Sequence, residues 1–181
     1  MAKGIYIPVE PDSPLEVREF ASLEDYQQAV GGLIEPVDLV DVGATIYVNE
    51  EGLVYELPFN PRATFMWWLH VPAAKNKAIL VGDAVIIGLP DHGGNTTGIP
   101  EDLERVLLHE GKFKLEVRVV GDPAWYTSAA SFDSYHETCI YGLLVLERRL
   151  TAEEVRIVPF HEDVDEDFGE LAVCKDSGQT A

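Results

Sequence analysis

Alternation of hydrophobic and polar residues is the clearest pattern in this chain, and it predicts several β-strands. Residues 112–120 alternate almost perfectly, with Phe113 and Leu115 on one face and charged side chains on the other. Residues 15–20 show the same alternation over a shorter stretch. Residues 138–146 form a nearly continuous apolar run, which predicts a second strong strand.

The first half of the chain contains a predicted hairpin and a predicted buried strand. Residues 45–48 and 53–57 are rich in β-branched and aromatic residues, and the turn-forming Asn49 to Gly52 separate them. Glu50 and Glu51 would then be exposed at a hairpin tip. Residues 79–87 are mostly aliphatic, which is typical of a strand that is buried on both faces.

Helix start and stop signals predict a small number of short helices. Ser22 is a suitable N-cap, the acids Glu24 and Asp25 follow in the first turn, and Gly31 can end the helix in a left-handed conformation. The pairs Asn60–Pro61 and Pro100–Glu101 begin two further predicted helices. We therefore expect an α+β fold, with a mixed, mainly antiparallel sheet and two or three short helices.

Two loop-like segments suggest how the chain is organised. Residues 88–100 are rich in glycine, proline, asparagine and threonine and mark a predicted joint. Residues 124–134 form a predicted polar loop that carries Trp125 and Tyr126. We expect an α+β core at 1–90, and a second half at 91–181 that packs on the same sheet or forms a small sub-domain. An acidic tail begins at about residue 161.

Four segments in order resemble the motifs of an uncharacterised domain family that occurs in phages, plasmids and some bacterial genomes. The segments are residues 29–35 (AVGGLIE), 47–52 (YVNEEG), 60–64 (NPRAT) and 82–88 (GDAVIIG), and the resemblance covers roughly residues 26–88. The resemblance implies a small α+β domain of mobile-element origin. It implies no catalytic residues, because the family has no established activity.

Charge is the strongest compositional signal. The 181 residues include 32 acids and 13 Lys or Arg, for a net charge of −19. Residues 1–60 hold 12 acids and 2 bases, residues 61–120 hold 7 of each, and residues 121–181 hold 13 acids and 4 bases. This distribution disfavours direct binding of nucleic acid or an anionic membrane and favours basic partners. Good solubility and adaptation of the host to salt would also explain an acidic surface.

Membrane and secretion signals are not evident in the sequence. No apolar run approaches the roughly 18 residues of a membrane span, and the first residues lack the apolar segment of a signal peptide. We therefore expect a cytoplasmic protein, in which Cys139 and Cys174 are free thiols.

Candidate chemistry is sparse. His136 and Cys139 lie three residues apart, but zinc needs three or four ligands, and no second pair has a matching spacing. The acidic run at 163–169 begins like a calcium loop but lacks the glycine and glutamate that such a loop requires. Phosphate-binding glycine loops and nucleophile elbows are absent. We predict neither a metal nor a cofactor, and no catalytic residue.

The sequence favours a non-catalytic accessory protein of a phage or other mobile element, which binds a basic or DNA-binding protein of the host or virus. A variant of this hypothesis is an acidic DNA mimic that inhibits a nuclease, restriction or other DNA-binding enzyme. A different hypothesis is a small metal-binding enzyme that uses His92, His136 and Cys139. The candidate binding residues are acids and loop aromatics: Glu24, Asp25, Glu50, Glu51, Trp125, Tyr126, Glu162, Asp163, Asp165, Glu166 and Asp167.

Overall fold

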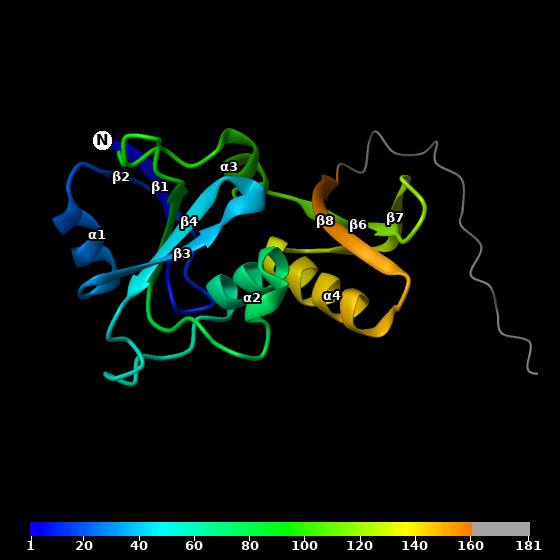
Figure 1. Cartoon of the computed structure of the whole chain (residues 1–181), viewed down its shortest axis with the longest axis horizontal. Coiled ribbons are helices and arrows are strands. Elements are labelled where there is room, and N and C mark those ends of the chain that lie inside the picture. The colour runs from blue at the N-terminus through cyan, green and yellow to red at the C-terminus, as the bar shows by residue number, and fades with distance from the viewer. Residues whose placement is uncertain (161–181) are drawn as a thin grey trace, which may run out of the picture.

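Two antiparallel sheets organise the chain in the computed structural model, which describes residues 1–160 (Figure 1). The larger sheet has the strand order β2-β1-β5-β4-β3, and the smaller has the order β7-β6-β8. The strands are β1 (Ala2–Ile7), β2 (Glu16–Phe20), β3 (Ile34–Leu39), β4 (Ala44–Asn49), β5 (Ala84–Gly88), β6 (Lys112–Val119), β7 (Trp125–Phe132) and β8 (Ala152–Phe160).

Four α-helices accompany the sheets in residues 1–160, so the predicted α+β class is confirmed with one helix more than expected. They are α1 (Leu23–Val30), α2 (Pro61–His70), α3 (Glu101–Leu107) and α4 (Tyr135–Arg148), with short 3-10 turns η1 (Val40–Val42) and η2 (Pro72–Ala74). Three of the four begin where the sequence predicts. Ser22, Asn60 and Pro100 are the N-caps of α1, α2 and α3, and Gly31 ends α1 with φ +75°.

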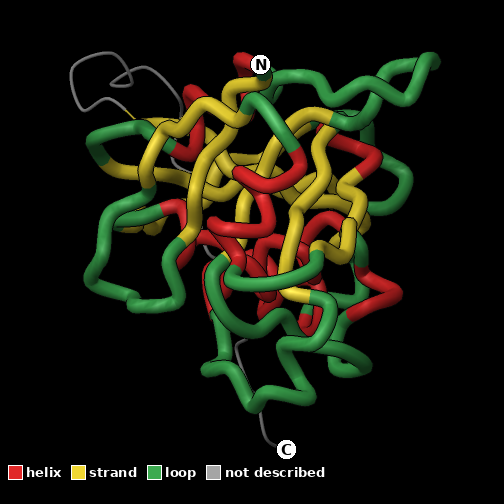
Figure 2. The backbone as a smooth tube through the Cα atoms, turned by 90° about the vertical axis from the view of Figure 1, so that its left-hand side faces the viewer, coloured by secondary structure: helices red, strands yellow, loops and turns green. Residues whose placement is uncertain are grey.

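Helices cover both faces of the five-stranded sheet, and its central strand β5 is buried throughout. Val85 and Ile87 point to the α1 side, where Tyr26 and Val30 pack on them. Ile86 points to the opposite side, where residues of α2 and α3 complete the main core. Figure 2 views the molecule from the α1 end, with the strands running side by side. Burial on both faces explains why this strand reads as a continuous apolar run.

The three-stranded sheet and α4 form a second unit, which is joined to the first through α2 (Figure 1). Helix α2 contributes to both cores: Met66 packs in the main core, and Leu69 packs with Cys139 and Leu143 of α4. Trp67 and Trp68 are each half-buried, one against each core. One helix is thus shared between the two units.

The predicted strand at 53–57 is wrong. Residues 51–56 form a single helical turn, in which the Tyr55 amide donates to the Glu51 carbonyl at 2.9 Å. Strand β4 pairs instead with β3 and β5. The buried strand predicted at 79–87 is confined to β5, because Gly82, at φ +71°, turns the chain before Ala84.

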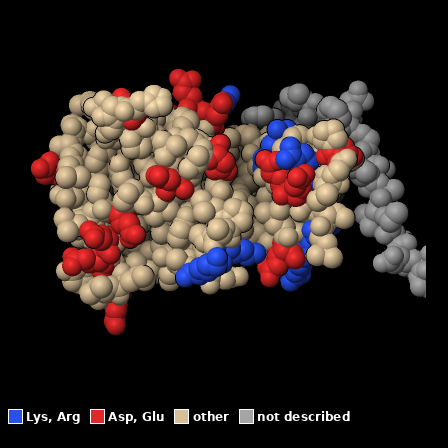
Figure 3. Space-filling view, in the orientation of Figure 1, with Lys and Arg blue, Asp and Glu red and all other residues tan. Residues whose placement is uncertain are grey.

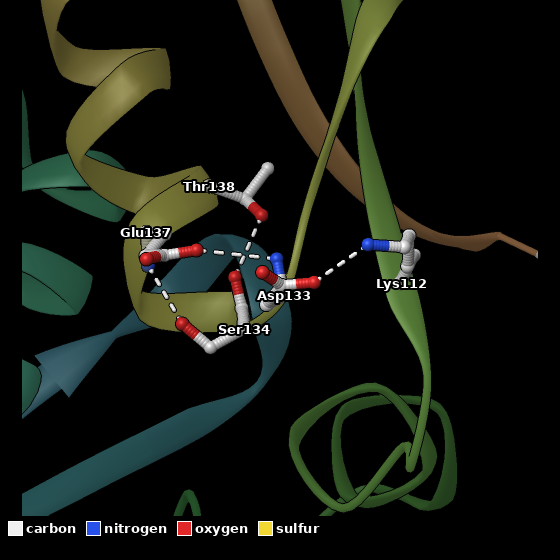
Figure 4. A network of polar contacts seen from close by, with 5 residues as sticks. All are labelled: Lys112, Asp133, Ser134, Glu137 and Thr138. Carbon is white, nitrogen blue, oxygen red and sulfur yellow. Dashed lines mark hydrogen bonds and ion pairs between the residues drawn. The ribbon is translucent and has the colours of Figure 1, made fainter.

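The second predicted strand, at 138–146, is also wrong, because this segment is helix α4. The Ser134 hydroxyl accepts a hydrogen bond from the Glu137 amide, and the Glu137 carboxylate accepts one from the Asp133 amide (Figure 4). This reciprocal cap starts a helix. Its buried residues recur at helical spacing, as Thr138, Cys139, Gly142, Leu143 and Val145.

The polar loop predicted at 124–134 is mostly a strand, β7, which pairs with β6 through an irregular register. The loop predicted at 88–100 is present, and its base is fixed to the sheet. Thr97 bridges to Gly88, and the Ile99 amide donates to the Lys3 carbonyl at 2.8 Å. The loop is therefore exposed mainly at its tip, residues 91–96.

Candidate functional site

The segment Asn60–Thr64, one of the four motifs, serves the fold. Asn60 is fully buried; its side-chain oxygen accepts from the Ala63 amide, and its side-chain nitrogen donates to the carbonyls of Ile7 and Gly82. Thr64, also fully buried, donates to the Leu80 carbonyl and accepts from the Leu80 amide. These groups fasten α2 to two neighbouring segments, so their hydrogen-bonding capacity is used within the fold.

Arg62 completes this anchoring. Its guanidinium donates to the carbonyls of Pro8, Glu10 and Ser13, all in the connection between β1 and β2. A planar guanidinium presents five N–H donors in a fixed fork, so it can reach several separate carbonyls at once. Arg62 therefore shapes the β1–β2 connection and is not available to a substrate.

A chain of polar side chains crosses the junction between the two units. Asp41 Oδ2 lies 2.7 Å from His70 Nδ1, and His70 Nε2 lies 3.2 Å from the Tyr135 hydroxyl. Tyr135 and the buried Cys139 lie one helical turn apart on α4. Burial raises the pKa of both Tyr135 and Cys139 well above their ordinary values. Burial alone would raise the pKa of Asp41, but the hydrogen bond and charge of His70 lower it overall.

These polar side chains at the junction are unsuited to nucleophilic catalysis. A reactive cysteine needs a lowered pKa and access to substrate, whereas the Cys139 thiol is buried and its raised pKa keeps it protonated at neutral pH. The physical role that remains is to satisfy polar groups where α4 packs on the first unit.

The three residues of the metal-enzyme hypothesis serve different parts of the fold. His92 lies in the exposed tip of the loop after β5. The His136 ring stacks on Phe65, and burial together with the charge of Arg62 lowers its pKa. Cys139 packs with Leu69 in the second core. Within residues 1–160, no group of three or more His, Cys, Asp or Glu side chains is placed to hold a metal ion.

A shallow depression of about 680 Å³ lies beside α3. Its wall is mostly charged and includes an ion pair between Lys3 and Glu104 at 2.5 Å. Small-molecule sites are typically enclosed and largely apolar. None of the candidate binding or metal-ligating residues named from the sequence lines this depression.

The aromatic pair Trp125 and Tyr126 lies on β7, half-buried within the second unit. Arg118 and Arg156 lie over the Trp125 ring, with 5.6 and 4.3 Å between guanidinium carbon and ring centroid. The Tyr126 hydroxyl donates to Asp122 at 2.5 Å. Both rings therefore have intramolecular partners, and their role as contact residues stays a prediction.

The acids at the start of α1 differ from each other. Glu24 is exposed, whereas Asp25 is half-buried, and its carboxylate accepts hydrogen bonds from the amides of Ala21 and Ser22, at 2.7 and 2.8 Å. These two hydrogen bonds lower the pKa of Asp25, and the bond from the Ala21 amide has the larger effect. Asp25 is therefore part of the helix cap, and its place in a binding surface stays a prediction.

Replacing Asp25 with alanine is expected to destabilise the protein at neutral pH and to have little effect in acid. A carboxyl group whose pKa is lowered by folding stabilises the native state above its unfolded pKa, which is about 3.9. That contribution is lost as the pH falls through the lowered folded-state value. Urea unfolding of wild type and Asp25→Ala from pH 2 to pH 7 measures the difference. The matched change Glu24→Gln removes a neighbouring carboxylate without removing the cap, so a similar profile for both variants would contradict the assignment.

Glu50 and Glu51 lie at the start of the helical turn after β4, both exposed. Asn49, which is buried, fixes this corner: its side chain donates to the Val30 carbonyl and accepts from the Glu51 amide. In Figure 3, acidic side chains gather at the lower left, where Figure 1 places the chain that follows β4. The remaining candidates, Glu162, Asp163, Asp165, Glu166 and Asp167, lie outside the described residues.

Comparison with known proteins identifies the family. Residues 3–113 match the model of a family described as a domain of unknown function, DUF3846. The chain belongs to the DUF3846 family. No curated protein and no solved structure matches it.

The DUF3846 match spans the whole five-stranded sheet and α3, and it reaches beyond the segment 26–88 that carries the four motifs. It ends at the start of β6, so the second unit lies almost entirely outside it. None of the helices in residues 1–160 is long and apolar enough to cross a bilayer.

Sequence reasoning missed one exposed feature of this DUF3846 domain, the apolar side chains of the turn after β4. Leu53, Val54 and Tyr55 suited a half-buried strand, but all three are exposed. The available signal was the run of three large apolar residues between glutamates at 50–51 and 56.

Proposed function

We propose that this protein acts without catalysis, by binding a basic protein through the acidic surface of its first unit. One observation carries the proposal: acids of the first unit mostly lack cationic partners. Residues 1–110 hold 18 acids and 6 bases, a net charge of −12. Only four of these acids form ion pairs with described residues, namely Glu16, Asp41, Asp102 and Glu104.

The second unit provides the contrast. Residues 111–160 hold 7 acids and 6 bases, a net charge of −1. Five of these acids are ion-paired, for example Glu116 with Arg156 at 2.5 Å and Asp133 with Lys112 at 2.7 Å. The acids of the second unit are therefore largely neutralised, one of them by Lys75 of the first unit, whereas the first unit presents carboxylates that a cationic partner could pair with. Such a field speeds association with a basic protein and repels nucleic acid.

A DNA mimic is the more specific form of this proposal. It is supported by the exposed carboxylates of the first unit that form no ion pair within residues 1–160, together with the seven acids of residues 161–181. On the face shown in Figure 3, the carboxylates form separate groups with uncharged surface between them. This arrangement favours a contact more local than the continuous acidic surface of a DNA mimic. An accessory role in a phage or other mobile element rests on the resemblance of the four motifs.

Reversing two charges of the acidic surface tests the proposal. A pull-down with the full chain, at low and at high salt, retains binding partners from a lysate of its host. The retained partner is then purified. Glu50→Lys/Glu51→Lys is expected to weaken binding at low salt about tenfold, because each exposed ion pair contributes on the order of 0.2–1 kcal/mol. The difference should shrink at high salt, where exposed charges are screened.

The control variant Glu147→Lys/Glu153→Lys changes the net charge equally but on the second unit. Equal weakening by both variants would show that only net charge matters and would contradict the proposed surface. Displacement of the partner by duplex DNA would support the mimic, and simultaneous binding of partner and DNA would refute it.

A further inference from the structure

The segment that follows β4 forms an apolar projection closed by backbone hydrogen bonds, which we call the apolar turn and define as residues 51–57. Backbone hydrogen bonds close it: Tyr55 to Glu51 at 2.9 Å, Glu56 to Leu53 at 3.3 Å, and Leu57 to Gly52 at 2.9 Å. Glu56 ends the turn in the left-handed region, at φ +52°. This is the geometry of a helix end in which a residue other than glycine takes the left-handed position.

The apolar turn is also anchored to the sheet beneath it. Gly52 is buried, and a side chain at that position would lie 2.8 Å from a methyl group of Val81. Leu57 is half-buried against Gly82. The Tyr55 hydroxyl donates to the Glu51 carboxylate at 3.1 Å. The turn therefore holds its shape before any partner binds, which reduces the entropy lost on binding.

Three large apolar side chains project from this frame. Leu53, Val54 and Tyr55 are 66%, 77% and 61% exposed. Two more large apolar residues come from segments that pair next to the turn: Phe59, which bridges to Val81, and Ile79, each 41% exposed. Contiguous exposed apolar groups with a polar border are characteristic of protein-binding surfaces.

The border is acidic. Glu50, Glu51 and Glu56 flank the three apolar residues in sequence, and none of them forms an ion pair with a described residue. An occupant of this surface must cover leucine, valine and tyrosine while meeting carboxylates at the edge. A second copy of the same turn would bring these glutamates against one another, so charge excludes a symmetric self-contact.

We propose that the apolar turn inserts into an apolar pocket with a basic rim on a different protein. This inference rests on the proposed function and names its contact point. The apolar side chains supply affinity that does not depend on salt, since burial of apolar surface is not screened. The glutamates supply orientation and rate of association, which do depend on salt.

Photo-crosslinking locates the contact in the full chain. A photoreactive residue is placed at position 54 or, as a matched control, at Val40, which is 74% exposed in η1 at the opposite end of the β3–β4 hairpin. Crosslinking to a single partner is expected at position 54. An excess of unlabelled wild-type protein should compete with this crosslinking, whereas an excess of the Leu53→Ser/Val54→Ser variant should not. Absence of crosslinking at position 54, or equal crosslinking at position 40, would overturn the inference.

Affinity of the purified pair then separates this inference from the proposed function. Leu53→Ser/Val54→Ser is expected to weaken binding about tenfold or more at both low and high salt, because central apolar contacts typically dominate an interface. Val40→Ser should leave it unchanged. If Glu50→Lys/Glu51→Lys weakens binding and the serine variant does not, the proposed insertion of the apolar turn is refuted, while the proposed binding through the acidic surface stands. If neither has an effect, both proposals fail.

Discussion

Replacement of Asn60 with alanine is expected to lower the free energy of unfolding by roughly 3–5 kcal/mol, since it removes a helix cap and leaves buried carbonyls without donors. The side chain is fully buried and makes three hydrogen bonds, to Ala63, Ile7 and Gly82. Because small proteins are stabilised by only about 5–15 kcal/mol in total, this loss would be a large part of the whole. Urea unfolding at pH 7 measures it.

The variant Asn60→Ser separates the contribution of the helix cap from that of the hydrogen bonds to the buried carbonyls. Serine can still accept from the Ala63 amide but does not reach both carbonyls, so it should recover only the cap, about 1 kcal/mol. Asn95→Ala serves as the control, because Asn95 is exposed and its hydrogen bonds within residues 1–160 are all to Asp91 of its own loop. A loss for Asn60→Ala no larger than for Asn95→Ala would show that the anchoring contacts contribute little.

Replacement of Leu115 with alanine is expected to destabilise both units together, by about 3–5 kcal/mol for a buried leucine. Leu115 is fully buried on β6 and faces Gly142 of α4. The effect should reach the first unit because α2 places Met66 in one core and Leu69 in the other. Loss of the second core would therefore weaken the packing of a helix that the first core needs.

Hydrogen exchange distinguishes cooperative from separate unfolding. Amides of β5 and of β6 should both lose protection in Leu115→Ala, and a denaturant titration should show one transition. Leu150→Ala is the control, since that side chain is 99% exposed. Loss of protection confined to β6, β7 and β8 would show that the units unfold independently despite the shared helix.

The family-like segment 60–64 has a structural explanation in this protein. Asn60, Arg62 and Thr64 each fasten one part of the chain to another through hydrogen bonds to backbone groups. Their presence in a domain of unknown function is accounted for by the fold. The groups left for a partner are at the surface, where most carboxylates of the first unit form no ion pair with described residues and the side chains of Leu53, Val54 and Tyr55 are exposed.

Local signals in the sequence determined the elements whose boundaries are set by capping and by strict alternation. Ser22 and Asn60 start two helices, because the requirement to satisfy the first amides of a helix is local. Pro100 precedes the first turn of a third helix without capping it through its side chain. Residues 112–119 form a strand with Phe113 and Leu115 on its buried face, because a period of two allows one face to be buried. The acidic character of the chain is likewise a property of its composition and needs no knowledge of the fold.

Tertiary structure decided between helix, strand and turn where the apolar residues of a segment fit either period, in one segment together with a local helix cap. Residues 138–146 suit a strand by propensity, but the Ser134 and Glu137 cap and the need to cover β6 and α2 make them helix α4. Residues 53–57 also suit a strand, yet β4 already pairs with β3 on one side and β5 on the other. With no free sheet edge beside β4, this segment closes into a turn, and the apolar side chains that a strand would have half-buried are left facing solvent.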